Sequence, residues 1–412
     1  MAEKILVIST FPPKGTLYNH SSSAVAGYTK NTLVWANEPD KNFSFTVLAD
    51  ILDSEEEYED NDIKVKRIWK RNSFSLFSSI YNEIVQNKDI RKIFFAFEWA
   101  MFGSKKYLMG FLPILLLLLR LQGKKIYFVS HGVLLNAGLV SIQMGVRENS
   151  LKAKIWSLGL KILYFFIILL SDKVVVFEEY LRQELLKLIP NSSKILTINH
   201  GVETKTDSSL SKKKTDEFAV QSFGFLIWYK GSDWLVEEMA NYFKNNPNSK
   251  IRLTMVGGAT KTYTDLNYKN YIDKIYDTAE KSDGKVQITG FIKEKEIADY
   301  FQKADLFILP YRVLVSASGP LSLAFTYRKP FLISENLKGY CLSNDFSQSL
   351  TQTGLSIKDL VFSMSGNGLP NKIENLIKDN NMLEKIQRFS ELMYEKRKWP
   401  VIGKKYADVL SK

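Results

Sequence analysis

Two strand-to-helix turns in the second half of the chain carry residue types that suit the binding of phosphate. One of them, residues 315–324 (VSASGPLSLA), follows the apolar run that ends at Tyr311. Here Ser318 has the character of a helix N-cap, Gly319 lets the backbone approach a ligand closely, and Pro320 suits the first helical turn. Free amides and the positive end of the helix dipole would then face a diphosphate. The same residues also fit a plain capped helix.

The other turn contains a lysine. Residues 224–231 (GFLIWYKG) end the first apolar run of this half and open a helix, and Lys230 lies at the turn between them. An ammonium group there can neutralise phosphate oxygens, although lysine is also the usual kind of surface residue. Arg312 could add a second cation or could be a surface residue. Two such turns in one half favour phosphate binding over a plain capped helix.

The elements that must position these turns follow from the hydrophobic pattern. Short apolar or β-branched runs alternate with longer helical stretches, which predicts a mostly parallel sheet covered by helices. In the first half the runs are 5–10, 45–50, 65–69, 92–97, 125–131, 173–178 and 195–199, and in the second 219–225, 252–257, 286–291, 306–311, 331–334 and 359–364. Each half is therefore predicted to form its own doubly wound sheet, and such sheets bind ligands beyond the carboxyl ends of their strands. Two such sheets that face each other leave a cleft.

Size and composition indicate a soluble protein of two domains. The chain has 412 residues, of which 45% are hydrophobic and 24% charged, and this length exceeds one ordinary core. The single cysteine, Cys341, excludes an intrachain disulfide, and one cysteine with three histidines cannot form a cysteine/histidine zinc site. The first ten residues are read as a strand and not as a signal peptide. A reducing, cytoplasmic compartment fits best.

Two polar stretches separate the expected elements. Residues 201–217, with the run Lys212-Lys213-Lys214 and little apolar content, are the expected linker between the halves. Residues 53–62 (DSEEEYEDND) are acidic and are expected to form a surface loop. The spacing of Asp60-Asn61-Asp62 is that of a metal-binding D-x-D, but acidic runs are usually solvated loops, and no metal site is assigned.

The net charge of +12 indicates an anionic partner, either a lipid surface, a phosphorylated substrate or nucleic acid. Nucleic acid is disfavoured because no recognised motif or aromatic interleaving accompanies the charge.

Two very apolar segments, 107–119 and 155–170, are shorter than the ~20 residues that span a bilayer and are read as buried helices. The second could instead contact an anionic membrane as a peripheral helix through Trp156, Tyr164, Phe165, Phe166, Lys152, Lys154 and Lys161. Core packing is the favoured interpretation.

The order of motifs along the chain is informative. In the second half it runs GFLIWYKG (224–231), VGG (256–258), ITGF (288–291), ADLFILP (304–310), the helix start at 318–321, and Lys329-Pro330. The first half has SHG (130–132), KVVVFEEYL (173–181) and NHGV (199–202), and Lys398-Trp399 leads a terminal helix. This series resembles glycosyltransferase family 4 over nearly the whole chain.

The resemblance implies an α/β fold of the GT-B type, in which two Rossmann-like doubly wound domains face a central cleft and a C-terminal helix crosses back to the first domain. Residues 1–203 would form the acceptor-side domain and residues 204–217 the linker. Residues 218–385 would form the nucleotide-sugar donor domain. Residues 386–412 would form the helix that packs back on the first domain.

The resemblance also implies the residues of the site. His131 matches the position that contacts the transferred sugar, and Lys230 would stabilise the leaving diphosphate, so these two are the expected catalytic residues. Gly27, in a loop that follows the first strand, would approach the donor phosphate from the other side of the cleft. The other expected donor contacts are Gly258, Gly290, Phe291, Arg312, Ser316, Ser318, Gly319, Pro320 and Leu321.

Two departures from the family pattern concern the donor site. The family often has arginine in a G-R-L segment, where this chain has Phe225. The usual E-x7-E pair is absent, because its slots fall on Val315 and Leu323 or, in the other register, on Ser316 and Ala324. The roles of the two glutamates, holding the hydroxyls of the donor sugar and ribose, would pass to hydroxyls, backbone or other side chains.

These features predict a retaining glycosyltransferase that moves a hexose-type sugar from a nucleotide-diphosphate sugar to a glycan or lipid-linked acceptor in cell-surface glycan synthesis. It is expected to need neither metal nor cofactor, to bind no nucleic acid, and to work in the cytoplasm or on the inner face of the cell membrane. The missing glutamates support one alternative, a catalytically silent GT-B protein that binds a nucleotide sugar or glycan as the partner of an active transferase.

Overall fold

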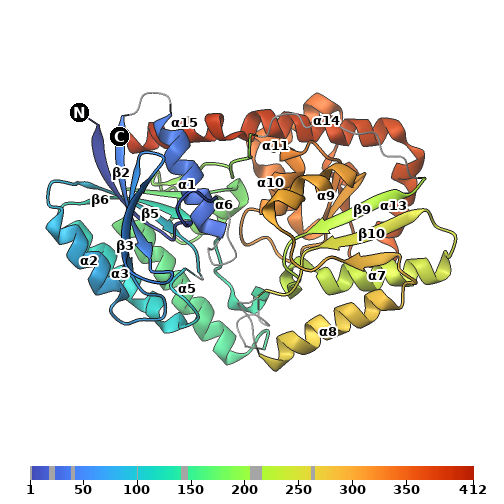
Figure 1. The fold of residues 1–412 in the computed structure, drawn as a ribbon, viewed down its shortest axis with the longest axis horizontal. Helices are drawn as coiled ribbons and strands as arrows, with labels where there is room; N and C mark the ends of the chain where they lie inside the picture. Colours follow the sequence, from blue (N-terminus) through green and yellow to red (C-terminus); the bar gives the residue numbers. More distant parts are fainter. Residues whose placement is uncertain are drawn as a thin grey trace.

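The computed structural model describes residues 2–17, 24–38, 42–99, 101–140, 147–204, 216–260 and 265–412. They form two α/β domains that lie side by side, and the last two helices of the chain run along one edge of both (Figure 1). Both chain ends lie on the first domain. The predicted architecture of two domains, each with its own mostly parallel sheet, is confirmed.

The first domain is built on an eight-stranded sheet in the order β3-β4-β2-β1-β5-β6-β7-β8. Neighbouring strands are parallel except for β3 and β4. The strands are β1 (Glu3–Ile8), β2 (Phe43–Asp50), β3 (Glu56–Asp60), β4 (Ile63–Trp69), β5 (Lys92–Phe97), β6 (Lys125–Ser130), β7 (Lys173–Val176) and β8 (Ile195–Thr197). All of β5 is buried, as expected for a parallel strand that is covered on both faces.

Helices cover both faces of this sheet. α1 (Ala24–Asn37) shares one hydrophobic cluster with the last helix, α15 (Trp399–Leu410). α2 (Leu76–Gln86), α3 (Leu112–Leu121), α5 (Leu151–Leu170) and α6 (Glu179–Leu186) share the cluster on the other face. Two short 3-10 helices, η1 (Lys106–Phe111) and η2 (Ala137–Val140), lie in the connections.

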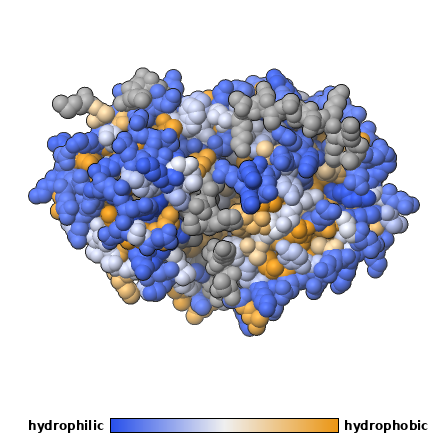
Figure 2. Space-filling view, in the orientation of Figure 1, coloured by the Kyte–Doolittle hydropathy of each residue, from blue (hydrophilic) through white to orange (hydrophobic). Residues whose placement is uncertain are grey.

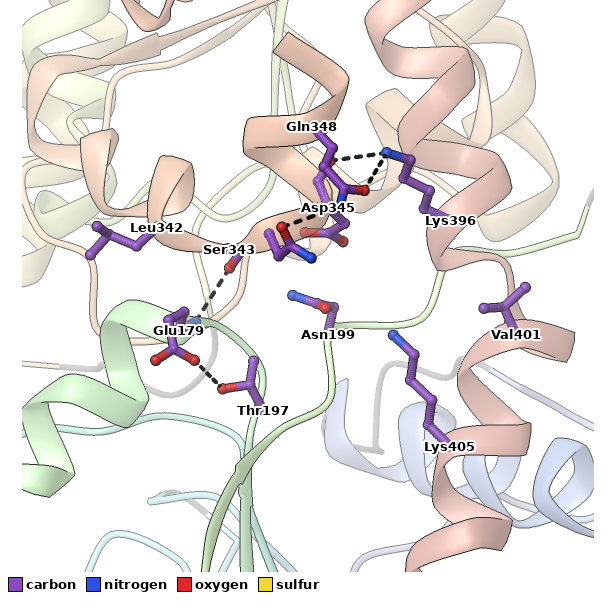
Figure 3. Close-up of a pocket in the computed structure, with 11 residues that line it drawn as sticks. Glu179, Thr197, Asn199, Leu342, Ser343, Asp345, Gln348, Lys396, Val401 and Lys405 are labelled. Carbon is purple, nitrogen blue, oxygen red and sulfur yellow. Dashed lines mark hydrogen bonds between the residues drawn. The ribbon is translucent and has the colours of Figure 1, made fainter. Parts of the chain in front are cut away.

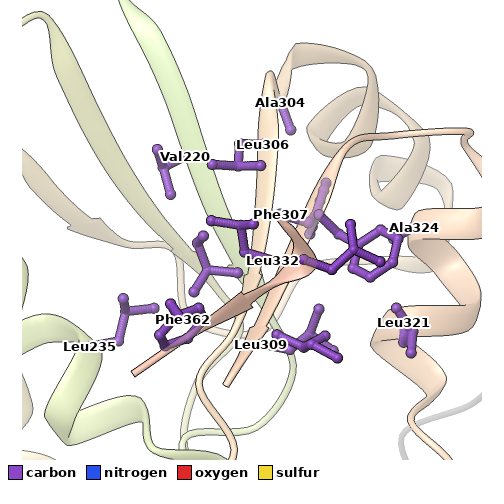
Figure 4. Close-up of a cluster of buried hydrophobic side chains, with 14 of the residues drawn as sticks. Val220, Leu235, Ala304, Leu306, Phe307, Leu309, Leu321, Ala324, Leu332 and Phe362 are labelled. Atoms are coloured by element: carbon purple, nitrogen blue, oxygen red, sulfur yellow. The ribbon is translucent and has the colours of Figure 1, made fainter. Parts of the chain in front are cut away.

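The second domain has a six-stranded parallel sheet in the order β11-β10-β9-β12-β13-β14. Its strands are β9 (Phe218–Phe223), β10 (Ile251–Val256), β11 (Val286–Ile288), β12 (Leu306–Leu309), β13 (Phe331–Ser334) and β14 (Val361–Phe362). Its helices are α7 (Ser232–Asn245), α8 (Leu266–Glu280), α9 (Ile297–Lys303), α10 (Gly319–Thr326), α11 (Asn344–Thr353), α12 (Ile357–Leu360), α13 (Gly368–Lys378) and α14 (Asn380–Arg397), with 3-10 turns η3 (Trp228–Lys230), η4 (Glu294–Glu296) and η5 (Glu335–Leu342). Aliphatic and aromatic side chains from strands and helices meet in one core (Figure 4).

The acidic run 53–62 forms part of a hairpin, so the expectation of a loop was wrong. β3 pairs antiparallel with β4, and Asn61 and Asp62 turn the chain with φ of 53° and 60°, the left-handed conformations of a two-residue hairpin. Asp60 is buried in an ion pair with Lys30, with 2.7 Å between the ammonium and carboxylate atoms. Cross-strand charge pairs stabilise this edge strand, and they leave no apolar alternation in the sequence.

The chain returns to the first domain at Lys398. Side chains of α14, including Ile386 and Phe389, belong to the core of the second domain, whereas α15 packs on α1. Of the segment 386–412, only the part after Lys398 therefore lies on the first domain. Lys398 also pairs in a parallel bridge with Val202, so the two connections between the domains lie side by side. Residues 205–215 of the predicted linker lie outside the described residues.

Candidate functional site

Glycines bring three turns into contact at the carboxyl edge of the second sheet. Gly224, Gly231 and Gly257 have φ of +124°, +71° and +144°. A Cβ on Gly257 would overlap the carbonyl of Gly224, and a Cβ on Gly231 would overlap the carbonyl of Pro310. Only glycine permits these approaches and backbone angles. The turns after β9, β10 and β12 thus form one rigid edge.

Lys230 projects over this edge. Its ammonium lies 2.9 Å from the position that a Cβ on Gly224 would occupy, and Cγ of Pro320 lies 3.6 Å from the same point. The two predicted phosphate turns are therefore adjacent in space. No described carboxylate pairs with Lys230, and its ammonium lies 5.9 Å from the centroid of the Tyr311 ring. Burial lowers the pKa of Lys230 to about 8.

The start of α10 is more fully hydrogen-bonded than the sequence suggests. The Ser318 hydroxyl accepts the N–H of Leu321 at 3.2 Å and lies 3.1 Å from the Tyr311 hydroxyl, so Ser318 is a true N-cap. Its own N–H is donated to the hydroxyl of Tyr340 at 3.0 Å. The expectation of open amides around both Ser318 and Gly319 was therefore wrong for Ser318.

One amide at this helix start remains open. Within the described part of the chain the N–H of Gly319 has no acceptor. Pro320 has no N–H, and the N–H of Leu321 donates to the capping hydroxyl of Ser318. A Cβ on Gly319 would meet nothing within 4 Å, so this residue faces open space. The side chain of Leu321 lies in the hydrophobic core.

Arg312 supports the lysine turn. Its guanidinium makes a two-pronged ion pair with Asp233, at 2.7 and 2.9 Å, and donates to the carbonyl of Trp228 at 2.6 Å. It also lies over the Trp228 ring at 4.9 Å. A carboxylate from α7 therefore neutralises the charge, so of the two possibilities for Arg312 a second free cation is excluded. What Arg312 does is to fix the turn that carries Lys230.

Two aromatic rings stand at the rim beside the glycines. A Cβ on Gly258 would lie 3.1 Å from Cα of Gly290, which has φ of +69°, so the turns after β10 and β11 touch. Phe225 and Phe291 are 41% and 54% exposed, and their ring centroids are 6.4 Å apart. Exposed aromatic faces at such a distance can stack on a planar ring.

His131 follows β6 at the carboxyl edge of the first sheet. Its ring makes edge contacts with Tyr28 and Phe177, at 4.9 and 4.8 Å between centroids. Its Nε2 is buried and has no hydrogen-bond partner among the described residues. Burial, aided by the neighbouring His200, lowers the pKa of His131 to about 3. The ring is therefore neutral at physiological pH and can exchange a hydrogen bond with a hydroxyl group.

A backbone bridge joins this histidine to the helix turn of the second domain. Gly132 pairs antiparallel with Ser316, and the N–H of Val133 donates to the carbonyl of Val315 at 2.8 Å. A Cβ on Gly132 would lie only 3.0 Å from that carbonyl. The expected residues His131 and Ser316, from opposite halves of the chain, are thus brought together.

His200, to which the sequence motifs assigned no role, forms a second link between the domains. Its Nδ1 lies 3.1 Å from the hydroxyl of Ser322 in α10, and its ring lies 4.8 Å from that of Tyr28. Burial lowers the pKa of His200 to about 4. Its position after β8, which corresponds to that of His131 after β6, is the sequence feature from which it could have been predicted.

The expected donor contact Gly27 precedes Tyr28 in the first turn of α1. Residues 21–23 of its loop lie outside the described residues.

A cavity of about 450 Å³ lies elsewhere between the domains, beside the C-terminal helices (Figure 3). Its lining includes Glu179 and Asn199 of the first domain, Asp345 of α11 and Lys405 of α15. None of the predicted site residues lines it. It is therefore separate from the edge that carries Lys230 and Gly319.

Comparison with known proteins agrees with this geometry. Residues 218–378, which include Lys230 and the start of α10, match the family described as glycosyl transferases group 1. No curated protein matches the chain by sequence.

Three solved structures that are similar to the whole chain are 11–14% identical to it in sequence. Sucrose-phosphate synthase from Thermosynechococcus elongatus has a TM-score of 0.70 at 14% identity, with 99% of this chain and 98% of that chain covered. An α,α-trehalose-phosphate synthase (UDP-forming) from Burkholderia vietnamiensis has a TM-score of 0.67 at 11% identity, with 100% and 97% covered. HepE from Anabaena, in complex with UDP and glucose, has a TM-score of 0.62 at 13% identity, with 100% of both chains covered.

The chain therefore has the GT-B fold, as predicted. Together with the family match over the second domain, this supports a glycosyltransferase.

Proposed function

We propose that the protein is a retaining, family 4-like hexosyltransferase that uses a nucleotide-diphosphate sugar. The observation that carries the proposal is the ammonium of Lys230, with which no described carboxylate pairs, at the carboxyl edge of the second sheet. It lies close to the start of α10, where the N–H of Gly319 has no acceptor among the described residues. The similar HepE was solved with UDP-glucose, which supports a donor of this class. A glycan or lipid-linked acceptor in cell-surface glycan synthesis fits the proposal.

The chemistry proposed for the site needs no metal ion. As the bond between the anomeric carbon and the donor phosphate oxygen breaks, negative charge grows on the leaving diphosphate. The ammonium of Lys230 and the N–H of Gly319 would stabilise that charge in the transition state. The acceptor oxygen forms the new bond on the face that the leaving group vacates, and its proton passes to the departing phosphate oxygen. The configuration at the anomeric carbon is retained.

Other side chains would hold the sugars. His131 would exchange a hydrogen bond with the transferred sugar through its unpartnered Nε2. Of the two serines near the empty glutamate slots, Ser318 uses its hydroxyl for the helix cap, which leaves the Ser316 hydroxyl for a donor hydroxyl. The bridge between Gly132 and Ser316 closes the cleft at this point and would keep water from the donor.

A donor panel tests the proposal. The purified protein is mixed with membrane extract and with uridine-, guanosine- or thymidine-diphosphate sugars, and the release of free nucleoside diphosphate is followed. We expect acceptor-dependent release from at least one donor, with the anomeric configuration of the product retained. No acceptor-dependent release from any donor would favour a silent protein that binds a nucleotide sugar or glycan as the partner of an active transferase.

A further inference from the structure

The outward face of α5 is apolar along its whole length. α5 is long and apolar enough to cross a membrane, but only 33% of its most apolar window is buried inside the protein. The buried side of the helix, which includes Leu160, Tyr164 and Ile167, packs in the core of the first domain. The opposite side is a stripe of exposed side chains at helical spacing, formed by Leu151, Ile155, Leu158, Ile162, Phe165, Phe166 and Leu169. The expectation of an ordinary buried helix therefore holds for one side of α5 only.

The neighbouring α3 and η1 extend this surface. α3 contacts α5 and exposes Ile114, Leu117, Leu118 and Leu121, while η1 exposes Tyr107 and Phe111. Figure 2 shows hydrophobic residues along the lower margin of the first domain, where α3 and α5 lie in Figure 1. We call these exposed residues of α3, η1 and α5 the apolar face. Large apolar patches that stay exposed on a folded protein mark sites of contact with a membrane or another protein.

Lysines border the apolar face, and acidic residues are absent from its elements. From the 3.6-residue period of α5, Lys154 and Lys161 lie along one edge of the stripe and Lys152 along the other. These three lysines are exposed, and no described carboxylate pairs with them. Neither 106–121 nor 151–170 contains an aspartate or a glutamate. Long lysine side chains at the edge of an apolar stripe place their charges at the level of lipid headgroups.

From this arrangement we infer that the apolar face docks on the surface of a bilayer that contains anionic lipids, with α5 parallel to the membrane plane. Charge complementarity selects this partner, because the lysines attract anionic headgroups while the stripe enters the acyl boundary. α5 does not cross the bilayer, since the hydroxyl of Tyr164 on its inner side donates to the carbonyl of Gly132 at 2.5 Å. Insertion across the bilayer would separate α5 from the core of its domain.

The docked orientation would place the cleft near the membrane. Gly132, which accepts the Tyr164 hydrogen bond, is also the residue that pairs with Ser316 across the domains. The helix on the membrane thus contacts the edge of the cleft on the acceptor side. The docking itself does not depend on sugar transfer and is measured without a donor.

Vesicle sedimentation with the full chain tests the inference. We expect the protein to sediment with vesicles of phosphatidylcholine and phosphatidylglycerol, and much less with phosphatidylcholine alone. The triple variant Ile155→Gln, Leu158→Gln, Ile162→Gln should lose about tenfold or more of its binding to the mixed vesicles, because three side chains no longer enter the acyl boundary. The matched control replaces three exposed apolar residues of the second domain, Leu266→Gln, Leu342→Gln and Ile377→Gln, and should bind like the wild type.

The charge of the face is tested separately. The variant Lys152→Gln, Lys154→Gln, Lys161→Gln should bind mixed vesicles more weakly and with less dependence on salt. Circular dichroism and the melting temperature verify that each variant is folded. Unchanged sedimentation of the apolar-face variant would overturn the inference. A second result would also overturn it: wild-type protein that binds neither kind of vesicle but forms a dimer that the apolar-face variant cannot form. The face would then bind a second copy of the chain.

Discussion

Lys230 differs from its neighbours in having a charge that no described carboxylate neutralises. Arg312, the other cation considered for the site, is paired with Asp233 and holds the turn in place. Lys230 is half-buried, and its ammonium lies beside the first turn of α10. An anion bound there would accept hydrogen bonds from both the ammonium and the Gly319 amide. An ammonium whose pKa is lowered by burial, and with which no described carboxylate pairs, is suited to an anionic ligand.

Replacing Lys230 should affect turnover much more than folding. Lys230→Ala removes the charge that we propose stabilises the leaving diphosphate, and we expect kcat to fall about 100-fold or more. The matched control is Lys274→Ala, whose exposed lysine forms a surface ion pair with Glu237 and should leave kcat unchanged. The measurement is nucleoside diphosphate release with the best donor of the panel. Full activity of the Lys230→Ala variant would remove this residue from the mechanism.

The pH dependence of the reaction should report the same ammonium. Lys230 is charged below its pKa of about 8 and neutral above it, so kcat/KM for the donor is expected to fall as the pH rises through about 8. The variant Lys230→Arg stays charged throughout this range and should retain part of the activity without the alkaline fall. An alkaline fall at the same pH in both proteins would assign it to a different group. Melting temperatures across the range control for unfolding.

At the scale of elements, the turns at the sheet edge depend on glycines with neighbours in contact. Gly231 ends η3 with φ of +71°, and its α-carbon faces the carbonyl of Pro310 after β12. The turn that carries Lys230 is therefore packed directly on the turn that leads to α10. The ion pair of Arg312 with Asp233 holds the same two turns together from the other side.

A pair of alanine substitutions separates the energetic cost of the backbone conformation from that of the contact between Gly231 and the Pro310 carbonyl. Gly284 has φ of +76° with nothing within 4 Å of its would-be Cβ, so Gly284→Ala should cost about 1–2 kcal/mol of stability. Gly231→Ala adds an overlap with the Pro310 carbonyl, and we expect it to cost about 1–3 kcal/mol more. The measurement is the shift of the urea unfolding transition of each variant. Equal shifts would mean that the contact at Gly231 is relieved at no cost.

At the scale of the whole molecule, a buried charge cluster ties the domains to the returning helix. Arg397, at the end of α14, pairs with Glu178 after β7 at 2.5 Å and with Asp345 in α11 at 2.6 Å. Arg397 and Glu178 are 2% and 0% exposed. Three distant segments, one from the first domain and two from the second, thus meet at one guanidinium beside the cavity of Figure 3.

Removing this guanidinium should loosen the junction of the domains. Arg397→Ala leaves the Glu178 carboxylate buried without its partner, which typically costs about 3–5 kcal/mol. Arg388→Ala removes an exposed arginine of the same helix, paired with Glu391, and should cost about 0–1 kcal/mol. The measurement is again the urea midpoint, followed by tryptophan fluorescence. Similar midpoints for the two variants would contradict a structural role for the buried cluster.

The local pattern of the chain predicted much of the fold. Alternation of apolar runs and helical stretches placed the parallel strands to within a few residues, because such strands are buried on both faces and so are continuously apolar, as KIFFAF of β5 is. The N-cap of α10 also followed from residue type, since Ser318 accepts a hydrogen bond from within its own helix. Of the hairpin of residues 56–69, the strand β4 was expected but β3 was missed, because charge pairs and not apolar alternation stabilise β3.

Residue order alone was enough to predict the two sheets, the turns at their carboxyl edges and the residue types in those turns. Tertiary structure decided which polar groups are open and which apolar groups are exposed. Asp233 neutralises the charge of Arg312, and the Tyr340 hydroxyl accepts a hydrogen bond from the N–H of Ser318. In both cases the partner comes from another segment of the chain. The core of the first domain covers one side of α5 and leaves the other side uncovered. Hydrogen-bond satisfaction and exposure depend on neighbours that residue order does not reveal, whereas strands and caps depend on residues a few positions apart.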